Sequence, residues 1–137
     1  MTRIALDTSA AIPLLVRSHA AHAQVRRHLR SREPVLTAHS LAETYSVLTR
    51  LPGDARLGAR DAVRLIESNF PDVLHPKTST LATLPAALAP LGVVGGAVYD
   101  ALVALAAVQR GVPLGTRDGR ALGTYVALGA DVEVIGD

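Results

Sequence analysis

Short apolar runs alternate along the chain with longer stretches in which apolar residues recur at helical spacing. The runs at residues 3–7, 35–37, 73–74, 112–116 and 132–135 predict short buried strands. Helices are expected over the stretches between them, at residues 10–16, 19–30, 40–50, 58–70, 78–91, 98–108 and 120–128. This alternation predicts an α/β fold with three α/β/α layers, in which helices cover both faces of a central, mainly parallel sheet of four to five strands.

Several element boundaries carry their own signals. Glu33-Pro34 is expected to break the helix over 19–30 before the second strand begins. In the helix over 40–50, the spacing of Leu41, Tyr45 and Leu48 predicts the buried face. The helix over 78–91 contains two prolines, so its ends are uncertain.

The stretch 98–108 is apolar on every side except for one acid. Asp100 is followed by eight apolar residues, and it is the only charged residue between Lys77 and Arg110. A helix that is apolar all round is expected to be buried. A charged side chain is rarely buried without a partner, so Asp100 in the first turn of this helix is a candidate functional residue.

Three further acids are expected at the same edge of the sheet. Asp7 follows the first strand, Asp118 lies just past the strand over 112–116, and Glu43 falls near the start of the helix over 40–50. In open α/β sheets, ligands bind at the carboxyl ends of the strands. We therefore expect Asp7, Glu43, Asp100 and Asp118 to converge.

The same residues also have an ordinary structural interpretation. Thr8 and Ser9 are candidate caps for the helix that follows them, and Asp7 itself has the properties of a capping acid. Glu43 lies three residues after Ser40, which is the spacing of a capping box. Local sequence leaves both interpretations of these acids open.

Converging carboxylates repel one another unless a cation lies between them. Oxygen ligands suit Mg²⁺ or Mn²⁺, whereas zinc is disfavoured because this site has no cysteine and no histidine pair at ligand spacing. A metal held by these acids would lower the pKa of a bound water, and Glu43 would complete the metal sphere or orient that water. Water attack on a phosphodiester leaves 5′-phosphate and 3′-hydroxyl ends.

Composition narrows the setting. A chain of 137 residues with 49% hydrophobic residues is expected to form one domain, 1–137. The absence of cysteine and of any long apolar run favours a cytoplasmic protein without a membrane segment. The formal net charge is +2, and basic residues gather between positions 17 and 32. Arg26, Arg27 and Arg30 in that segment, together with Arg117, are candidate RNA contacts, although a solvated helix face explains the segment equally well.

Four short motifs together resemble a known family. They are Leu6-Asp7-Thr8-Ser9, Ser40-Leu41-Ala42-Glu43, Tyr99-Asp100-Ala101-Leu102 and Thr116-Arg117-Asp118. In this order and spacing they resemble the PIN-domain ribonucleases, and more narrowly the VapC toxins of bacterial VapBC toxin-antitoxin systems.

The resemblance implies a PIN-like fold and a metal-dependent endoribonuclease that cuts structured RNA, either tRNA or rRNA. It assigns Asp7, Glu43, Asp100 and Asp118 to an acidic quartet that holds one or two Mg²⁺ or Mn²⁺ ions. Thr116 and Thr8 or Ser9 match supporting polar residues. It also implies a homodimer and a cognate VapB-like antitoxin. Residues 95–98 lack the extra polar group of some relatives, which leaves a second metal site in doubt.

Two other function classes stay open at this point. A phosphatase of the haloacid dehalogenase type also has an aspartate after its first strand, but it places a second aspartate two residues on, where this chain has Ser9. A non-catalytic PIN-fold module would bind RNA or a protein through its basic helix. The presence of all four acids disfavours this second alternative.

Overall fold

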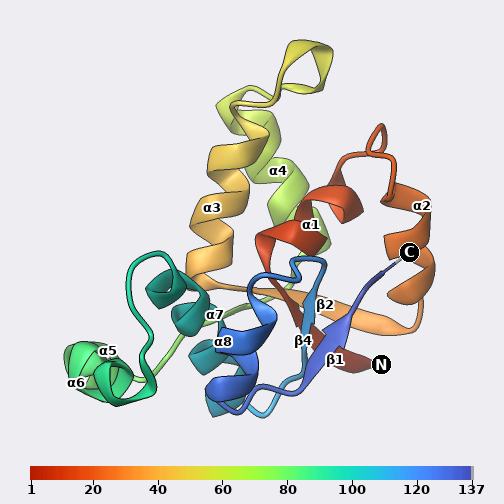
Figure 1. Cartoon of the computed structure of the whole chain (residues 1–137). Coiled ribbons are helices and arrows are strands. Elements are labelled where there is room, and N and C mark those ends of the chain that lie inside the picture. The colour runs from red at the N-terminus through yellow and green to blue at the C-terminus, as the bar shows by residue number, and fades with distance from the viewer. Residues whose placement is uncertain (137) are drawn as a thin grey trace.

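A single five-stranded parallel sheet forms the centre of the computed structural model, which describes residues 1–136. Its strands lie in the order β3-β2-β1-β4-β5. Their bounds are Thr2–Leu6 (β1), Arg32–Thr37 (β2), Val73–Leu74 (β3), Leu114–Thr116 (β4) and Val132–Val134 (β5). Figure 1 shows β1, β2 and β4 with helices around them. The predicted fold class and strand number are confirmed.

Helices precede or follow each strand and cover both faces of the sheet. They are α1 (Thr8–Leu15), α2 (His22–His28), α3 (Ala38–Leu48), α4 (Ala59–Asn69), α5 (Thr78–Ala82), α6 (Leu84–Leu88), α7 (Ala97–Gln109) and α8 (Leu122–Ala127), with short 3-10 turns at Gly53–Ala55 and Ala89–Leu91. Among residues 1–136, no helix combines the length and apolar character needed to cross a membrane.

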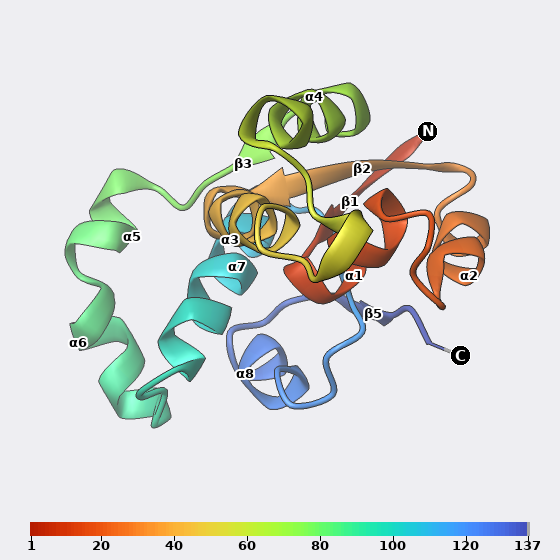
Figure 2. The same cartoon turned by 90° about the horizontal axis from the view of Figure 1, so that it is seen from above.

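Alternate residues of the central strand β1 feed two separate cores. Ile4 and Leu6 pack with apolar residues of α1 to α4, whereas Ala5 packs with residues of α7 and α8. Successive side chains of a strand point to opposite faces, so this division produces the three layers. Figure 2 shows α5 and α6 beside α7, away from the sheet, where Leu88 and Val93 pack against Ala101.

The neighbouring strands β1 and β4 bring two of the predicted acids to one edge. Leu6 pairs with Gly115, and the Asp7 amide donates to the Gly115 carbonyl at 3.2 Å. A Cβ at Gly115 would lie 2.9 Å from Ile135 and 3.0 Å from both Ile4 and Leu6, so only glycine fits this close approach. Asp7 and Asp118 therefore emerge from adjacent strand ends.

The prediction that Glu33-Pro34 lies outside the second strand was wrong, because β2 begins at Arg32. The Leu36 amide donates to the Asp72 carbonyl beside β3, and Pro34, two residues earlier, faces the same side. Strand β3 pairs only with Leu36 and Thr37. Proline is tolerated because its missing amide faces a position where β2 has no strand partner.

Three helix predictions also need correction. The basic helix is α2 at His22–His28, shorter than the predicted 19–30. The stretch 78–91 forms two short helices and a 3-10 turn, since Pro85 and Pro90 interrupt it. In α3, the buried positions are Ser40, Thr44 and Leu48, whereas Tyr45 is exposed.

The central helix α7 is confirmed, although it is not buried all round. Most of its buried residues, among them Val103, Ala104 and Ala107, pack against the sheet and α8. Tyr99 and Val108 are exposed. Small alanines on the inner face let α7 approach the sheet closely, which places its first turn, with Asp100, at the edge where β1 and β4 end.

Candidate active site

One pocket of about 380 Å³ collects the four predicted acids. Asp7 comes from the end of β1, Glu43 from α3, Asp100 from the first turn of α7, and Asp118 from the loop after β4. Thr8 and Ser9 line the same pocket. The predicted convergence of these four segments at the carboxyl edge of the sheet is thus present in the structure.

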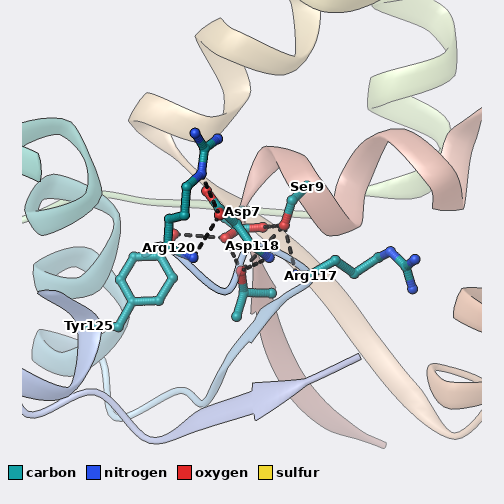
Figure 3. A network of polar contacts seen from close by, with 7 residues as sticks. Asp7, Ser9, Arg117, Asp118, Arg120 and Tyr125 are labelled. Carbon is teal, nitrogen blue, oxygen red and sulfur yellow. Dashed lines mark hydrogen bonds and ion pairs between the residues drawn. The ribbon is translucent and has the colours of Figure 1, made fainter. Parts of the chain in front are cut away.

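Asp7 is the most strongly held of the four acids. It is 5% exposed, and its Oδ1 accepts hydrogen bonds from the Ser9 hydroxyl at 2.6 Å and from the Ala10 amide at 3.3 Å. Its Oδ2 accepts from the Tyr125 hydroxyl at 2.7 Å and from the Thr116 hydroxyl. Figure 3 shows Ser9 and Tyr125 beside the Asp7 carboxylate. The hydrogen bonds fix its orientation before any ligand arrives.

Opposing influences act on the Asp7 carboxyl. Burial raises its pKa above the ordinary aspartate value, and the hydrogen bonds from Ser9, Thr116 and Tyr125 counteract that rise. Asp7 also caps α1 through the Ala10 amide, so the prediction that Thr8 and Ser9 are the caps was wrong. The structural interpretation of Asp7 is correct as well, because one carboxylate both caps the helix and lines the pocket.

Glu43 does not belong to a capping box. Thr37 caps α3, and the box partner is Ser40, whose hydroxyl accepts from the Thr37 amide at 2.9 Å. The predicted capping box of Ser40 and Glu43 was wrong, because the box lies three residues earlier in the chain. Ser40 is the third residue of the helix and not its cap. Glu43 is exposed and faces the pocket without that structural duty.

Asp100 and Asp118 complete the acidic wall. Burial raises the pKa of Asp100, and the charges of Asp118, Asp7 and Glu43 raise it further. Asp118 is held by its backbone, whose amide donates to the Thr116 hydroxyl at 3.0 Å, and the Arg120 side chain lies 3.6 Å from its Oδ1. The four carboxylates are therefore close enough to repel one another.

Sequence reasoning missed the three residues of the pocket that carry rings, Tyr125, His39 and Tyr99. Tyr125 is 1% exposed and donates to Asp7 from α8, across 118 positions of sequence. Burial and the Asp7 charge raise the pKa of Tyr125 well above its ordinary value, so its hydroxyl stays a proton donor. His39 and Tyr99 line the same pocket, and their stacked rings lie 5.3 Å apart between centroids. No short motif signals these contacts, because each joins distant segments.

The candidate RNA-contacting arginines do not surround the acids. Arg26, Arg27 and Arg30 line a separate hollow that shares no residue with the acidic pocket. The Arg117 amide donates to Ser9 at 2.7 Å, but its guanidinium points away from Asp7 and donates to the Ile135 carbonyl at 2.9 Å (Figure 3). The basic segment and the acidic pocket are distinct surfaces.

The pocket lining fits a hard divalent cation in its chemistry. Its charged donors are carboxylates, and the Thr8 hydroxyl oxygen is buried without a hydrogen-bond partner. In the conformation described for residues 1–136, no three acidic or histidine side chains are already set as ligands of one ion. Carboxylates that share an ion would have to turn their oxygens inward.

Comparison with known proteins identifies the family. The PIN domain family model matches residues 4–125. The chain is 53% identical to Ribonuclease VapC27 of Mycobacterium tuberculosis H37Rv over 131 residues, which cover 96% of each chain. All four acids of the pocket lie within the matched PIN range.

Solved structures show the same fold. VapBC2 from Rickettsia felis, bound to a DNA fragment from its promoter, matches with a TM-score of 0.66 and 13% identity over 97% of this chain and 98% of the other. VapBC-5 from Mycobacterium tuberculosis, a member of the VapBC family of toxin-antitoxin systems, matches with a TM-score of 0.56 and 22% identity over 100% of both chains. The chain therefore belongs to the PIN-domain family, alongside the VapC ribonucleases.

Proposed function

We propose that this chain is a metal-dependent endoribonuclease and the toxin of a toxin-antitoxin pair. The proposal rests on one observation: four acids from distant segments of the chain line the same pocket. They are Asp7, Glu43, Asp100 and Asp118. Membership of the PIN-domain family and 53% identity to a protein named as a ribonuclease support it. Structured RNA, either tRNA or rRNA, is the proposed substrate class.

The acids are the proposed ligands of Mg²⁺ or Mn²⁺. Burial raises the pKa of Asp100, and the three neighbouring carboxylates raise it further; their repulsion supports a cation among the acids, as do the oxygen ligands that the four acids offer. When bound, such an ion lowers the pKa of a coordinated water and offsets negative charge on the scissile phosphate. Asp7 is held for this role by Ser9, Thr116 and Tyr125.

The side chains divide the remaining work. Glu43 is exposed at the pocket and has no capping duty, so it can accept a proton from the attacking water. The Thr8 hydroxyl oxygen is buried beside the pocket and has no hydrogen-bond partner among residues 1–136, which supports a polar ligand at this position. In the proposed reaction, water attacks phosphorus and the bond to the 3′ oxygen breaks, which leaves 5′-phosphate and 3′-hydroxyl ends.

A protein partner completes the proposal. The VapBC-5 relative belongs to a family of toxin-antitoxin systems, and its fold spans this whole chain. We therefore infer that a VapB-like antitoxin holds the nuclease inactive, and that the nuclease forms a homodimer in the cytoplasm. The haloacid dehalogenase alternative loses support, because Ser9 donates to Asp7 at 2.6 Å where that class has a second aspartate.

The decisive experiment combines metal and mutation. Purified wild-type protein, D7N and D61N are incubated with total RNA in Mg²⁺, in Mn²⁺ or with a chelator. Wild type and D61N should give the same discrete fragments only with metal, because Asp61 is exposed on α4 outside the pocket. D7N should give none. Fragments from D7N, or fragments that persist in the chelator, would contradict the proposal.

A further inference from the structure

A second hollow, of about 440 Å³, lies on the surface formed by α1, α2, β2 and the end of α4. Three arginines of the segment after Ala21 contribute to it: Arg26, Arg27 and Arg30. All three are exposed, and none is in an ion pair among residues 1–136. We call this site the arginine hollow.

Two other basic residues of the segment, Arg32 and His28, share a carboxylate partner, which sets them apart from these three. Arg32 donates to both carboxylate oxygens of Glu133, at 2.8 and 2.9 Å, and His28 lies 3.3 Å from the same carboxylate. The basic segment thus divides into a part that ties α2 and β2 to β5 and a part whose charges are left unbalanced. A purely solvated face does not require such a division.

The rest of the lining does not cancel the three charges. Ser68 and Asn69 donate to the Leu65 carbonyl at the end of α4, at 3.2 and 2.8 Å. The end of a helix carries only about half a negative charge. Two or more positive charges therefore stay unbalanced in a concave site, where they attract an anion.

We propose that the arginine hollow binds the phosphate backbone of an RNA strand and docks the body of the substrate away from the acidic pocket. This inference rests on the proposed ribonuclease function. Guanidinium groups form paired hydrogen bonds with phosphate. Arg26, Arg27 and Arg30 lie within five residues, so a strand that carries one charge on every nucleotide can meet more than one of them.

The structure offers a matched control for charge. Arg26 and Arg30 are four residues apart, as are Arg60 and Arg64, which lie exposed on α4 outside the hollow. R26Q/R30Q and R60Q/R64Q therefore remove the same charge at the same spacing. Both variants are made in the D7N background, so that bound RNA stays intact, and thermal melts check that each one folds.

Binding of unfractionated tRNA is measured between roughly 50 and 200 mM KCl. R26Q/R30Q should raise the Kd by about tenfold and lower the slope of log K against log salt by about 2, because two phosphate contacts are lost. R60Q/R64Q should change the slope by less than about half a unit. In a protein that keeps the wild-type Asp7 and can therefore cleave, R26Q/R30Q should raise KM for RNA and leave kcat unchanged.

The outcomes separate this inference from the proposed function. Equal losses in the two variants would overturn the docking site, while Asp7-dependent cleavage by the wild type would still support the ribonuclease. No cleavage, together with a slope loss confined to R26Q/R30Q, would overturn the ribonuclease and retain RNA binding in the hollow. Displacement of tRNA from the hollow by polyglutamate at equal charge, as effective as by unlabelled tRNA, would assign the hollow to an acidic protein segment instead.

Discussion

The Tyr125 hydroxyl is one of four donors that converge on Asp7, and it lies where solvent does not reach. A carboxylate offers about four lone-pair positions, so the four donors fix its plane and its rotation. We therefore propose that Tyr125 is a positioning residue that acts through Asp7.

Y125F removes one hydroxyl and keeps the ring in the core. We expect Mn²⁺ affinity to fall by about tenfold, since a supporting hydrogen bond of this kind typically sets metal affinity. Cleavage should lose kcat with little change in KM, and stability should fall by about 1–3 kcal/mol. Isothermal titration with Mn²⁺ provides the readout.

Y99F is the matched control, because Tyr99 lines the same pocket but is 56% exposed and stacks on His39. It should bind Mn²⁺ as the wild type does. If Y125F lost stability while its Mn²⁺ affinity stayed at the wild-type level, Tyr125 would be a core residue without a positioning role.

Asp100 makes the metal-free protein sensitive to pH. In the folded protein the pKa of Asp100 is raised above the ordinary value of 3.8. At a pH between that ordinary value and the raised one, the folded protein therefore binds more protons than the unfolded protein. The free energy of unfolding attributable to Asp100 therefore falls as pH rises through that window. D100N should melt a few degrees above wild type at pH 7, roughly 2–5 °C, and the gain should shrink below pH 4.

Thermal melts with a chelator test this expectation, with D61N on the exposed face of α4 as the control. D61N should follow the wild type at every pH. A D100N protein that melts below wild type at pH 7 would show that Asp100 is a structural group, and would remove the argument for repulsion among the acids.

At the scale of elements, strand β4 depends on a glycine that no other residue can replace without movement. A methyl group at position 115 would lie closer to side-chain carbons of Ile135, Ile4 and Leu6 than van der Waals contact allows. All three of these residues are fully buried. Because the Asp7 amide bonds to Gly115, movement of β4 would also disturb the acidic pocket.

G115A should therefore lower the free energy of unfolding by about 1–3 kcal/mol, as overpacking does. G123A is the counterpart: it lies in α8 with open space around it, and alanine there should stabilise by about 0.5–1 kcal/mol. Urea unfolding measures both. Equal midpoints for G115A and wild type would mean that β4 has room that the described packing denies.

Element types were predictable from sequence, but several boundaries were not. The strands and helices followed from apolar periodicity, which burial imposes directly. Pro34 was misread because a proline in a strand is tolerated only when the missing amide faces no partner, and that depends on the short length of β3. The cap of α3 was misplaced by three residues because Thr37 and Ser40 are both good caps locally.

At the scale of the whole molecule, two cores share one sheet. Apolar residues of β1 contribute to both, Ile4 and Leu6 on one face and Ala5 on the other. Loss of either layer therefore exposes the strands that support the other. We infer that residues 1–137 form one domain and predict a single cooperative unfolding transition.

A variant with Tyr125 as the only tyrosine, Y45F/Y99F, makes this measurable. Tyrosine fluorescence then reports the core under α7 and α8, while far-ultraviolet circular dichroism reports all helices. The chain has no tryptophan to mask the signal. The two urea curves should coincide; an earlier fluorescence midpoint would mean that the two layers unfold separately.

The site was predictable to the extent that topology alone determines it. Parallel strands bring their carboxyl ends together, so Asp7, Asp118 and the helix starts with Glu43 and Asp100 could be placed on one edge. Contacts that depend on how α8 and α3 pack, such as those of Tyr125 and His39, have no counterpart in local sequence. The roles of the four acids as metal ligands and catalysts are proposals.

The position of Pro34 also bears on how the molecule avoids unwanted association. Strand β3 covers only the last two residues of β2, which leaves the earlier part of β2 without a strand neighbour on that side. An open strand edge is a template for pairing with another chain and for fibril growth. Pro34 offers no amide there, and Glu33 beside it carries a charge held by Arg3 at 2.8 Å. Pro34, which made this strand hard to recognise from the sequence, thus removes a hydrogen-bond donor from the open edge, and we expect it to oppose aggregation.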